Sequence, residues 1–189
     1  MDISVSDVLK AKEKILDALN AGCSIRLSKD AERALGMKSS YYLAKYILGY
    51  NKLNNNFHRS FCAFQDRYLY ENVLILAPRK HYKSTLKTIT GSIILCLNIP
   101  DIAINIMANT LDNSAKFLFE IKDHFINNEK FRHLYPEHAV QYLRQEGRHD
   151  RFTTPARKKT TIIDSPIVKA DPRPGSNIIK SNPPPISGA

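Results

Sequence analysis

Apolar runs of strand length alternate along the middle of the chain with segments whose apolar residues recur at helical spacing. Val73 to Ala77 is an uninterrupted apolar run, which predicts a buried strand, and Pro78 supplies turn chemistry directly after it. Leu86 to Leu97 then carries apolar residues at helical spacing. Ile102 to Ala108 predicts a second buried strand, and Leu111 to Ile126 a long helix. Strand, helix, strand and helix in this order predict a parallel sheet covered by helices.

The first seventy residues show helical patterns only. They predict an amphipathic helix over residues 4–20 that stops at Gly22, a short helix capped by Ser28, a helix over 41–48 capped by Ser39 or Ser40, and another over 57–70. Residues 131–147 predict a broken helix, and 152–154, 160–163 and 166–169 predict short strands. We therefore divide the chain into a helical lead-in at 1–70, an α/β part at 71–170, and a tail at 171–189. The tail is rich in Pro, Ser and Gly, and we expect it to be disordered.

The turn between the first predicted strand and its helix is basic and ends in Lys83-Ser84-Thr85. Strand, tight loop, Lys-Ser/Thr and helix is the order of a phosphate-binding loop, in which loop amides and the helix N-terminus meet the phosphate charge. The usual pattern is G-x-x-x-x-G-K-[ST], and Pro78 and Tyr82 stand here in place of its two glycines. An ordinary strand-to-helix turn with a solvated basic face is the alternative interpretation.

The sequence of this turn resembles the Walker A loop of large terminase subunits, the motors that package DNA into tailed-phage heads. It reads Leu-Ala-Pro-Arg-Lys-His-Tyr-Lys-Ser-Thr over residues 76–85. That family often places an Arg four residues before the Lys, as Arg79 stands to Lys83. Residues 41–49, 57–59 and 104–110 also resemble the family, so the resemblance covers roughly residues 40 to 170. The family's loop glycine is Lys80 here, so the backbone freedom of glycine is missing.

The resemblance implies a fold, cofactors and partners. The fold would be the incomplete parallel sheet of a P-loop NTPase, covered by helices and preceded by a helical lead-in. ATP and Mg²⁺ would be the cofactors of a motor that packages viral DNA into a prohead. Double-stranded DNA, the small terminase subunit and the portal would be partners, the full-length protein would be an oligomer, and the protein would work in the host cytoplasm.

The resemblance also implies residue roles. Lys83 would contact the outer phosphates, Ser84 would hold the magnesium ion, and Arg79 would stabilise the charge of the transition state in cis. In the lead-in, Phe57, His58 and Gln65 are the candidates for covering the base. The nucleotide-binding set as a whole would be Pro78, Arg79, Lys80, His81, Tyr82, Lys83, Ser84 and Thr85.

An acid pair that would hold magnesium and polarise water is missing from the pattern. No apolar run ends in Asp-Glu or Asp-Asp, and the nearest candidate is Asp164 in a short, half-polar segment. In the resembled family such segments, and a nuclease domain, lie further along the chain. We therefore expect the first half of an ATPase lobe, truncated or cut, that binds nucleotide weakly and turns over essentially none. Lys80 and Tyr82 should add strain if the loop needs positive φ there.

Two alternatives stay open at this point. One is a non-hydrolysing remnant of such a gene that binds nucleotide or nucleic acid. The other is a different P-loop protein, such as a helicase or a small-molecule kinase.

A net charge of +10 and a pI near 9.5 favour a polyanionic partner, nucleic acid before a membrane surface. A basic tract follows residue 131, and it is either a DNA-facing edge or a solvated face. Its candidate DNA contacts are Arg144, Arg148, Lys158 and Lys159. The three cysteines are far apart, which fits a reducing cytosol. No apolar stretch is long enough to span a membrane, so we expect no membrane association.

Overall fold

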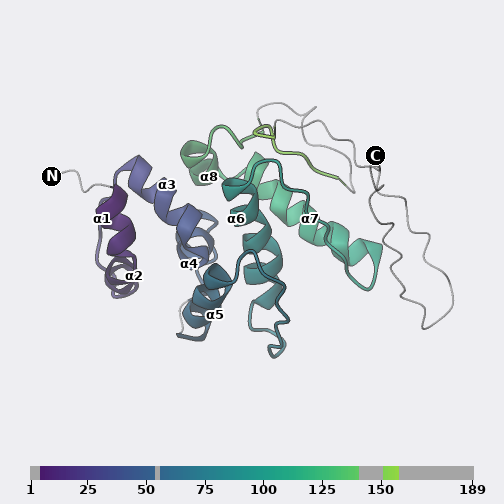
Figure 1. Cartoon of the computed structure of the whole chain (residues 1–189), viewed down its shortest axis with the longest axis horizontal. Coiled ribbons are helices and arrows are strands. Elements are labelled where there is room, and N and C mark those ends of the chain that lie inside the picture. The colour runs from purple at the N-terminus through teal and green to yellow at the C-terminus, as the bar shows by residue number, and fades with distance from the viewer. Residues whose placement is uncertain (1–4, 54–55, 141–150, 158–189) are drawn as a thin grey trace, which may run out of the picture. The chain divides into compact units, whose positions relative to one another are not determined.

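The structure, a computed structural model, describes residues 5–53, 56–140 and 151–157, all within the first of two units of the chain, residues 1–159. This part is helical (Figure 1). Its α-helices are α1 (Val5–Lys10), α2 (Lys12–Asn20), α3 (Lys29–Lys38), α4 (Ser40–Tyr42), α5 (Asn56–Arg67), α6 (Gly91–Asn98), α7 (Leu111–Ile126) and α8 (Glu129–Leu134). Two π-helical segments, η1 (Leu43–Ile47) and η2 (Ser84–Thr90), continue directly from α4 and into α6.

The predicted parallel sheet is wrong for the described residues, none of which lies in a strand. Val73 to Ala77 and Ile102 to Ala108 are irregular and lie at the surface. Leu74 is 83% exposed and Leu76 is 86% exposed, where a buried strand would hide both. A strand is stable only when a neighbour completes its backbone hydrogen bonds, and the described residues provide no such neighbour. Residues 152–154 are irregular too, and the strands predicted at 160–163 and 166–169 lie outside the described residues.

The helix ends follow local capping chemistry. Ser28 Oγ accepts a hydrogen bond from the Ala31 N–H at the start of α3, and Ser39 Oγ accepts one from the Tyr42 N–H at the start of α4. The predicted Ser28 cap is confirmed, and of the two candidates Ser39 and Ser40 the cap is Ser39. In both caps a short side-chain oxygen satisfies an N–H group that the first helical turn leaves without a partner. Gly22 ends the N-terminal helical region with a φ of +85°.

The core is built around the continuous helical stretch formed by η2 and α6. Its most deeply buried residues are Leu86, Ile89, Ile93, Ile94 and Leu97, each at most 3% exposed. Contacts join η2 to α7 and η1, and α6 to α3. Figure 1 shows α6 between the α4 and α5 pair and α7. The residues that begin η2 are therefore fixed to the best-packed helix of the fold.

A second anchor joins α3 to the end of α8. Tyr135 is fully buried, and its hydroxyl donates a hydrogen bond to the Arg33 carbonyl oxygen at 2.9 Å. Arg33 also forms an ion pair with Glu137. Gly36 lies under this contact, where a Cβ atom would collide with the Tyr135 hydroxyl and with Ile47 Cδ1. The close approach of α3 to Tyr135 and η1 therefore requires glycine at this position.

Candidate phosphate-binding loop

The predicted phosphate-binding residues lie in an exposed loop that runs directly into η2. Pro78, Arg79, Lys80, His81 and Lys83 are exposed, and Ser84 begins the helix. Tyr82, Ser84 and Thr85 are half-buried. The first hydrogen bond of the helix joins the Leu86 N–H to the Tyr82 carbonyl oxygen at 2.8 Å. The loop amides before Leu86 therefore lie at the positive end of the helix dipole, where anions are stabilised.

Two loop residues have positive φ without being glycine. Lys80 has a φ of +67° and Tyr82 a φ of +54°, and they are the non-glycine residues of the described part that do so. Residues with a Cβ atom rarely occupy this region, and the conformation costs on the order of 1–3 kcal/mol each. The resembled terminase loop carries glycine at the Lys80 position, and the general phosphate-loop pattern carries one at the Tyr82 position. We expected strain at Lys80 and Tyr82 if the loop needs positive φ there, and the structure has positive φ at both residues.

Hydrogen bonds within the loop hold it closed. The Lys83 ammonium donates to the Ala77 carbonyl oxygen at 3.1 Å, so the two ends of the loop are joined across six residues. His81 Nδ1 donates to the Arg79 carbonyl oxygen at 2.8 Å. An ammonium group has three donors, so Lys83 keeps capacity for an anion beside the contact with Ala77. Lys83 therefore lies at the mouth of the loop with its charge available.

Aromatic contacts join the loop to the first turn of α5. The His58 and Tyr82 rings meet edge-on with centroids 5.6 Å apart, and the Phe57 and His81 rings meet edge-on at 5.4 Å. His58 is 5% exposed, so it anchors this contact in the body of the protein. Burial, and then the nearby charge of His81, lower the pKa of His58. A neutral ring is therefore favoured next to a loop that already carries three cations.

Of the three lead-in candidates, the structure brings two to the loop. Phe57 and His58 contact it, whereas Gln65 is buried against α4 and α6. Gln65 Nε2 donates to Ser40 Oγ at 3.0 Å, and a Cβ atom on Gly91 would lie 3.4 Å from the same nitrogen. The geometry therefore gives Gln65 a packing role. The two ring pairs were not predicted from the sequence, where the only sign of them is aromatic residues in both segments.

Several other predicted site residues lie outside the described residues. They are Arg144, Arg148, Lys158, Lys159 and Asp164. Among residues 5–53, 56–140 and 151–157, no group of three or more His, Cys, Asp or Glu side chains could hold a metal ion. Ser84 supplies one hydroxyl, and Mg²⁺ in proteins usually takes a carboxylate as well as substrate phosphates. The residues present thus fit the phosphate part of a nucleotide better than a separate magnesium site.

Comparison of the chain with protein-family models, with curated proteins and with solved structures finds no match. The loop must therefore be interpreted from its own geometry. In the part of the chain that the structure describes, no helix is long and apolar enough to cross a membrane.

Proposed function

We propose that the loop from Pro78 to Thr85 binds the phosphate groups of ATP. The observation that carries this proposal is the backbone of the loop, which takes positive φ at Lys80 and Tyr82 without glycine. Strained conformations of this kind persist only where the surrounding structure enforces them, and they cluster at ligand sites. The loop ends at a helix N-terminus, beside a lysine that spans its two ends.

We expect the loop amides, Lys83, Ser84 and Arg79 to take part in binding the phosphates. The amides before Leu86 would donate hydrogen bonds to phosphate oxygens, and the Lys83 ammonium would neutralise the outer phosphates as a point charge. The hydroxyl of Ser84, the first residue of η2, would contribute to holding Mg²⁺ together with those phosphates. Arg79 is exposed and would reach the γ-phosphate only if the loop brings it over the nucleotide. A bound Mg²⁺ would supply neutralisation of the phosphate charge.

The resemblance to large terminase subunits makes the DNA-packaging motor our first candidate for the whole protein. On that basis we propose double-stranded DNA, the small terminase subunit and the portal as partners of an oligomeric protein in the host cytoplasm. A second candidate is a nucleotide-binding chain that does not hydrolyse ATP. It is supported by the described residues, which bring no cluster of acids to the loop.

Calorimetry with ATP and Mg²⁺, run beside a phosphate-release assay, tests the proposal. We expect weak binding by the wild-type chain and loss of binding in Lys83→Ala. Lys10→Ala is the matched control, because Lys10 is an exposed lysine in the last turn of α1. Equal binding by the wild-type chain and Lys83→Ala would contradict the site. Turnover that Lys83→Ala abolishes would favour the motor over the non-hydrolysing candidate.

A further inference from the structure

One face of α5 carries a row of aromatic side chains. Phe57, Phe61, Phe64 and Tyr68 follow one another at spacings of three or four residues, which places them on the same side of the helix. The Phe57 and Phe61 ring centroids lie 6.2 Å apart, and those of Phe64 and Tyr68 lie 4.8 Å apart. The Tyr68 N–H donates to the Phe64 carbonyl oxygen, which extends the helical turn past Arg67. We call these four residues the α5 aromatic row.

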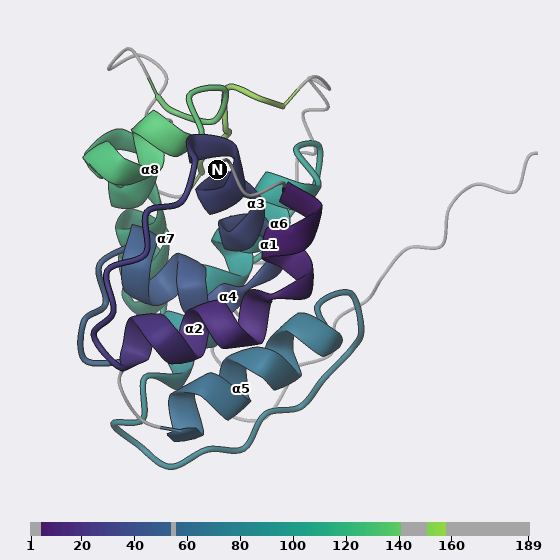
Figure 2. The same cartoon turned by 90° about the vertical axis from the view of Figure 1, so that its left-hand side faces the viewer.

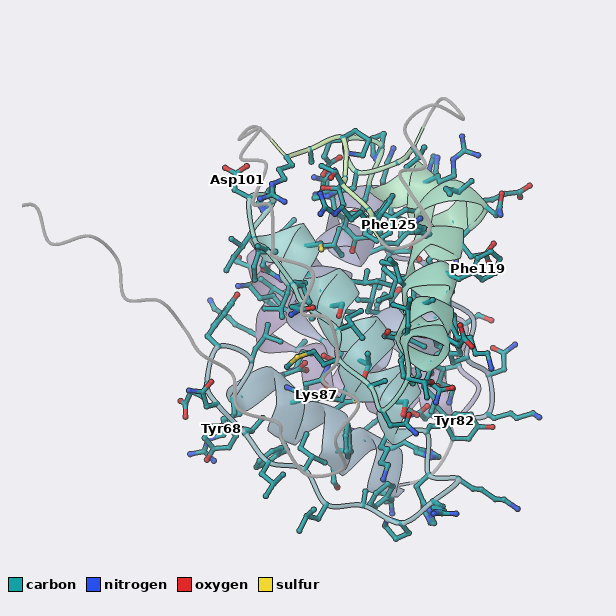
Figure 3. All side chains as sticks on the ribbon, turned by 90° about the vertical axis from the view of Figure 1, so that its right-hand side faces the viewer. Tyr68, Tyr82, Lys87, Asp101, Phe119 and Phe125 are labelled. Carbon is teal, nitrogen blue, oxygen red and sulfur yellow. The ribbon has the colours of Figure 1, made fainter. Side chains whose placement is uncertain are left out.

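Phe61 anchors the α5 aromatic row in the core, Tyr68 is half-buried, and Phe57 and Phe64 are open to solvent. Phe61 is 8% exposed and belongs to the hydrophobic core, whereas Phe57 is 40% exposed and Phe64 is 44% exposed. Figure 2 shows α5 at the edge of the described helices with a loop running beside it. In Figure 3, α5 lies between the labelled Tyr68 and Tyr82. Solvent therefore reaches large rings on a rigid helix.

Cationic side chains stand at both ends of the α5 aromatic row. The Arg67 guanidinium lies over the Tyr68 ring, with Cζ 5.5 Å from its centroid. At the other end His81 contacts Phe57, and His81 follows the exposed Arg79 and Lys80 in the loop. The surface is thus rich in rings and positively charged, with rings and cations side by side.

Two charged side chains near the α5 aromatic row, Arg59 and Asp66, are already paired with other groups. Arg59 forms ion pairs with Glu13 and Asp17 of α2, so its charge is already balanced there. Both carboxylate oxygens of Asp66 accept the Ser40 N–H at the start of α4. Between residues 60 and 82 this leaves Glu71 as the remaining acid against Arg67, Arg79 and Lys80.

We propose that the α5 aromatic row and its flanking cations bind single-stranded nucleic acid. Exposed rings stack with bases of any sequence, and neighbouring Arg and Lys side chains neutralise the backbone phosphates. In a duplex the faces of the bases are stacked on one another, so the rings would have no base to meet. The positive charge that frames the rings favours a polyanion over an apolar protein surface. This site adjoins the proposed ATP loop at Phe57 and His81, but it uses the face of α5 and does not need Lys83.

Fluorescence anisotropy with a short labelled oligothymidine and its oligouridine counterpart tests the proposal. Binding should fall with salt, because phosphate contacts release counterions. Phe64→Ala and Tyr68→Ala should each weaken binding about tenfold, as expected for loss of one stacked base. Arg67→Gln should weaken binding and reduce the slope of affinity against salt. A duplex of the same length should bind less tightly than the single strand.

Phe119→Ala is the matched control, because Phe119 is a 72% exposed phenylalanine on α7. It should bind like the wild-type chain, and all variants should keep the wild-type melting temperature to within a few degrees. Lys83→Ala should also retain most of the binding, which separates this site from the nucleotide loop. Wild-type affinity in Phe64→Ala and Tyr68→Ala would overturn the proposal. So would a wild-type dimer that these two substitutions convert to a monomer, because the rings would then be a protein interface.

Discussion

The buried ring of His58 meets the ring of Tyr82 edge-on, at 5.6 Å between centroids and 79° between planes. This contact joins a core position of α5 to a residue with positive φ, one position before Lys83. A tyrosine would leave that conformation if nothing held its side chain. The His58–Tyr82 pair therefore helps to hold Tyr82 in its positive-φ conformation.

Loss of the His58 ring should loosen the loop. An edge-on aromatic pair contributes about 0.5–1.5 kcal/mol beyond its buried area. We expect His58→Ala to raise the rate of tryptic cleavage after Arg79 and Lys80 by about two- to tenfold relative to the wild-type chain. His58→Phe keeps an aromatic edge and should cleave at close to the wild-type rate. Equal cleavage in His58→Ala and the wild-type chain would show that the pair does not hold the loop.

Relief of backbone strain should be measurable at Lys80. Lys80 is exposed and has a φ of +67°, so glycine removes the Cβ clash without loss of packing. We expect Lys80→Gly to raise the free energy of unfolding by about 0.5–1 kcal/mol, since the greater freedom of glycine in the unfolded chain offsets part of the relief. Lys80→Ala loses the same side chain but keeps the Cβ atom, and should not gain. Urea denaturation measures the free energy of unfolding of both variants. A gain in Lys80→Gly alone indicates relief of strain, whereas an equal gain in both would indicate that loss of the cation is the cause.

Gly36 should be intolerant of even one added methyl group. Alanine would place its Cβ atom against the Tyr135 hydroxyl and Ile47, and overpacking of this kind typically costs about 1–3 kcal/mol. Tyr135→Phe removes the hydroxyl and its hydrogen bond to the Arg33 carbonyl oxygen, at a cost of about 1 kcal/mol. Thermal unfolding of both single variants and the double variant should show that the double variant loses less than the sum of the two. Simple additivity would place the collision elsewhere.

The free energy of unfolding should fall as the pH drops below about 6.5, the ordinary pKa of histidine. His124 Nε2 donates to the Tyr50 hydroxyl at 2.9 Å, and Asn128 Nδ2 donates to His124 Nδ1 at 3.3 Å, so the ring is neutral. Burial lowers the pKa of His124, although Asp123 and Glu120 oppose the shift. The unfolded chain therefore binds a proton first, beginning near pH 6.5, and the folded state loses stability as the pH falls further.

The measurement for this prediction is the free energy of unfolding in urea between pH 7.5 and pH 5. Each histidine held neutral contributes a slope of up to about 1.4 kcal/mol per pH unit. Burial also lowers the pKa of His58 and His138, which adds to the slope, whereas burial raises the pKa of Asp66, which opposes it. His124→Gln should reduce the slope without abolishing it, because His58 and His138 still contribute. An unchanged slope in that variant would exclude His124 as a contributor.

Features set by local chemistry were predictable from the sequence. Leu111 to Ile126 was predicted as a helix and is α7 with the same ends, because apolar spacing and the Thr110 cap are both local. Ser28 was likewise identified as a cap, and Ser39 was one of two candidates beside Ser40. The N-terminal pattern over residues 4–20 predicted one helix, whereas the structure interrupts it at Ala11 between α1 and α2.

Features that depend on distant partners were not predictable. Val73 to Ala77 has the composition of a buried strand, but composition does not say whether another segment is available to pair with it. In the structure every second residue of this segment faces the solvent. The helix start after Lys83 was expected from the order Lys83-Ser84-Thr85 and is confirmed, whereas phosphate binding by the loop stays a prediction. The ring contacts of the loop with Phe57 and His58 join segments more than twenty residues apart, so no local sequence pattern predicts them.

The π-helical form of η2 has a consequence for insertions and deletions. The Thr90 hydroxyl donates to the Thr85 carbonyl oxygen at 2.9 Å, five residues back, which matches the wider turn of a π-helix. Such a turn contains one residue more than an α-helical turn. A deletion of one residue within a regular α-helix turns everything before it by about 100° around the helix axis. A single-codon deletion within Ser84–Thr90 would instead restore α-helical spacing, and the loop would keep nearly its present direction relative to Ile93 and Leu97. We therefore expect η2 to tolerate the loss of one residue better than α6 or α7, where the same deletion would turn buried side chains out of the core.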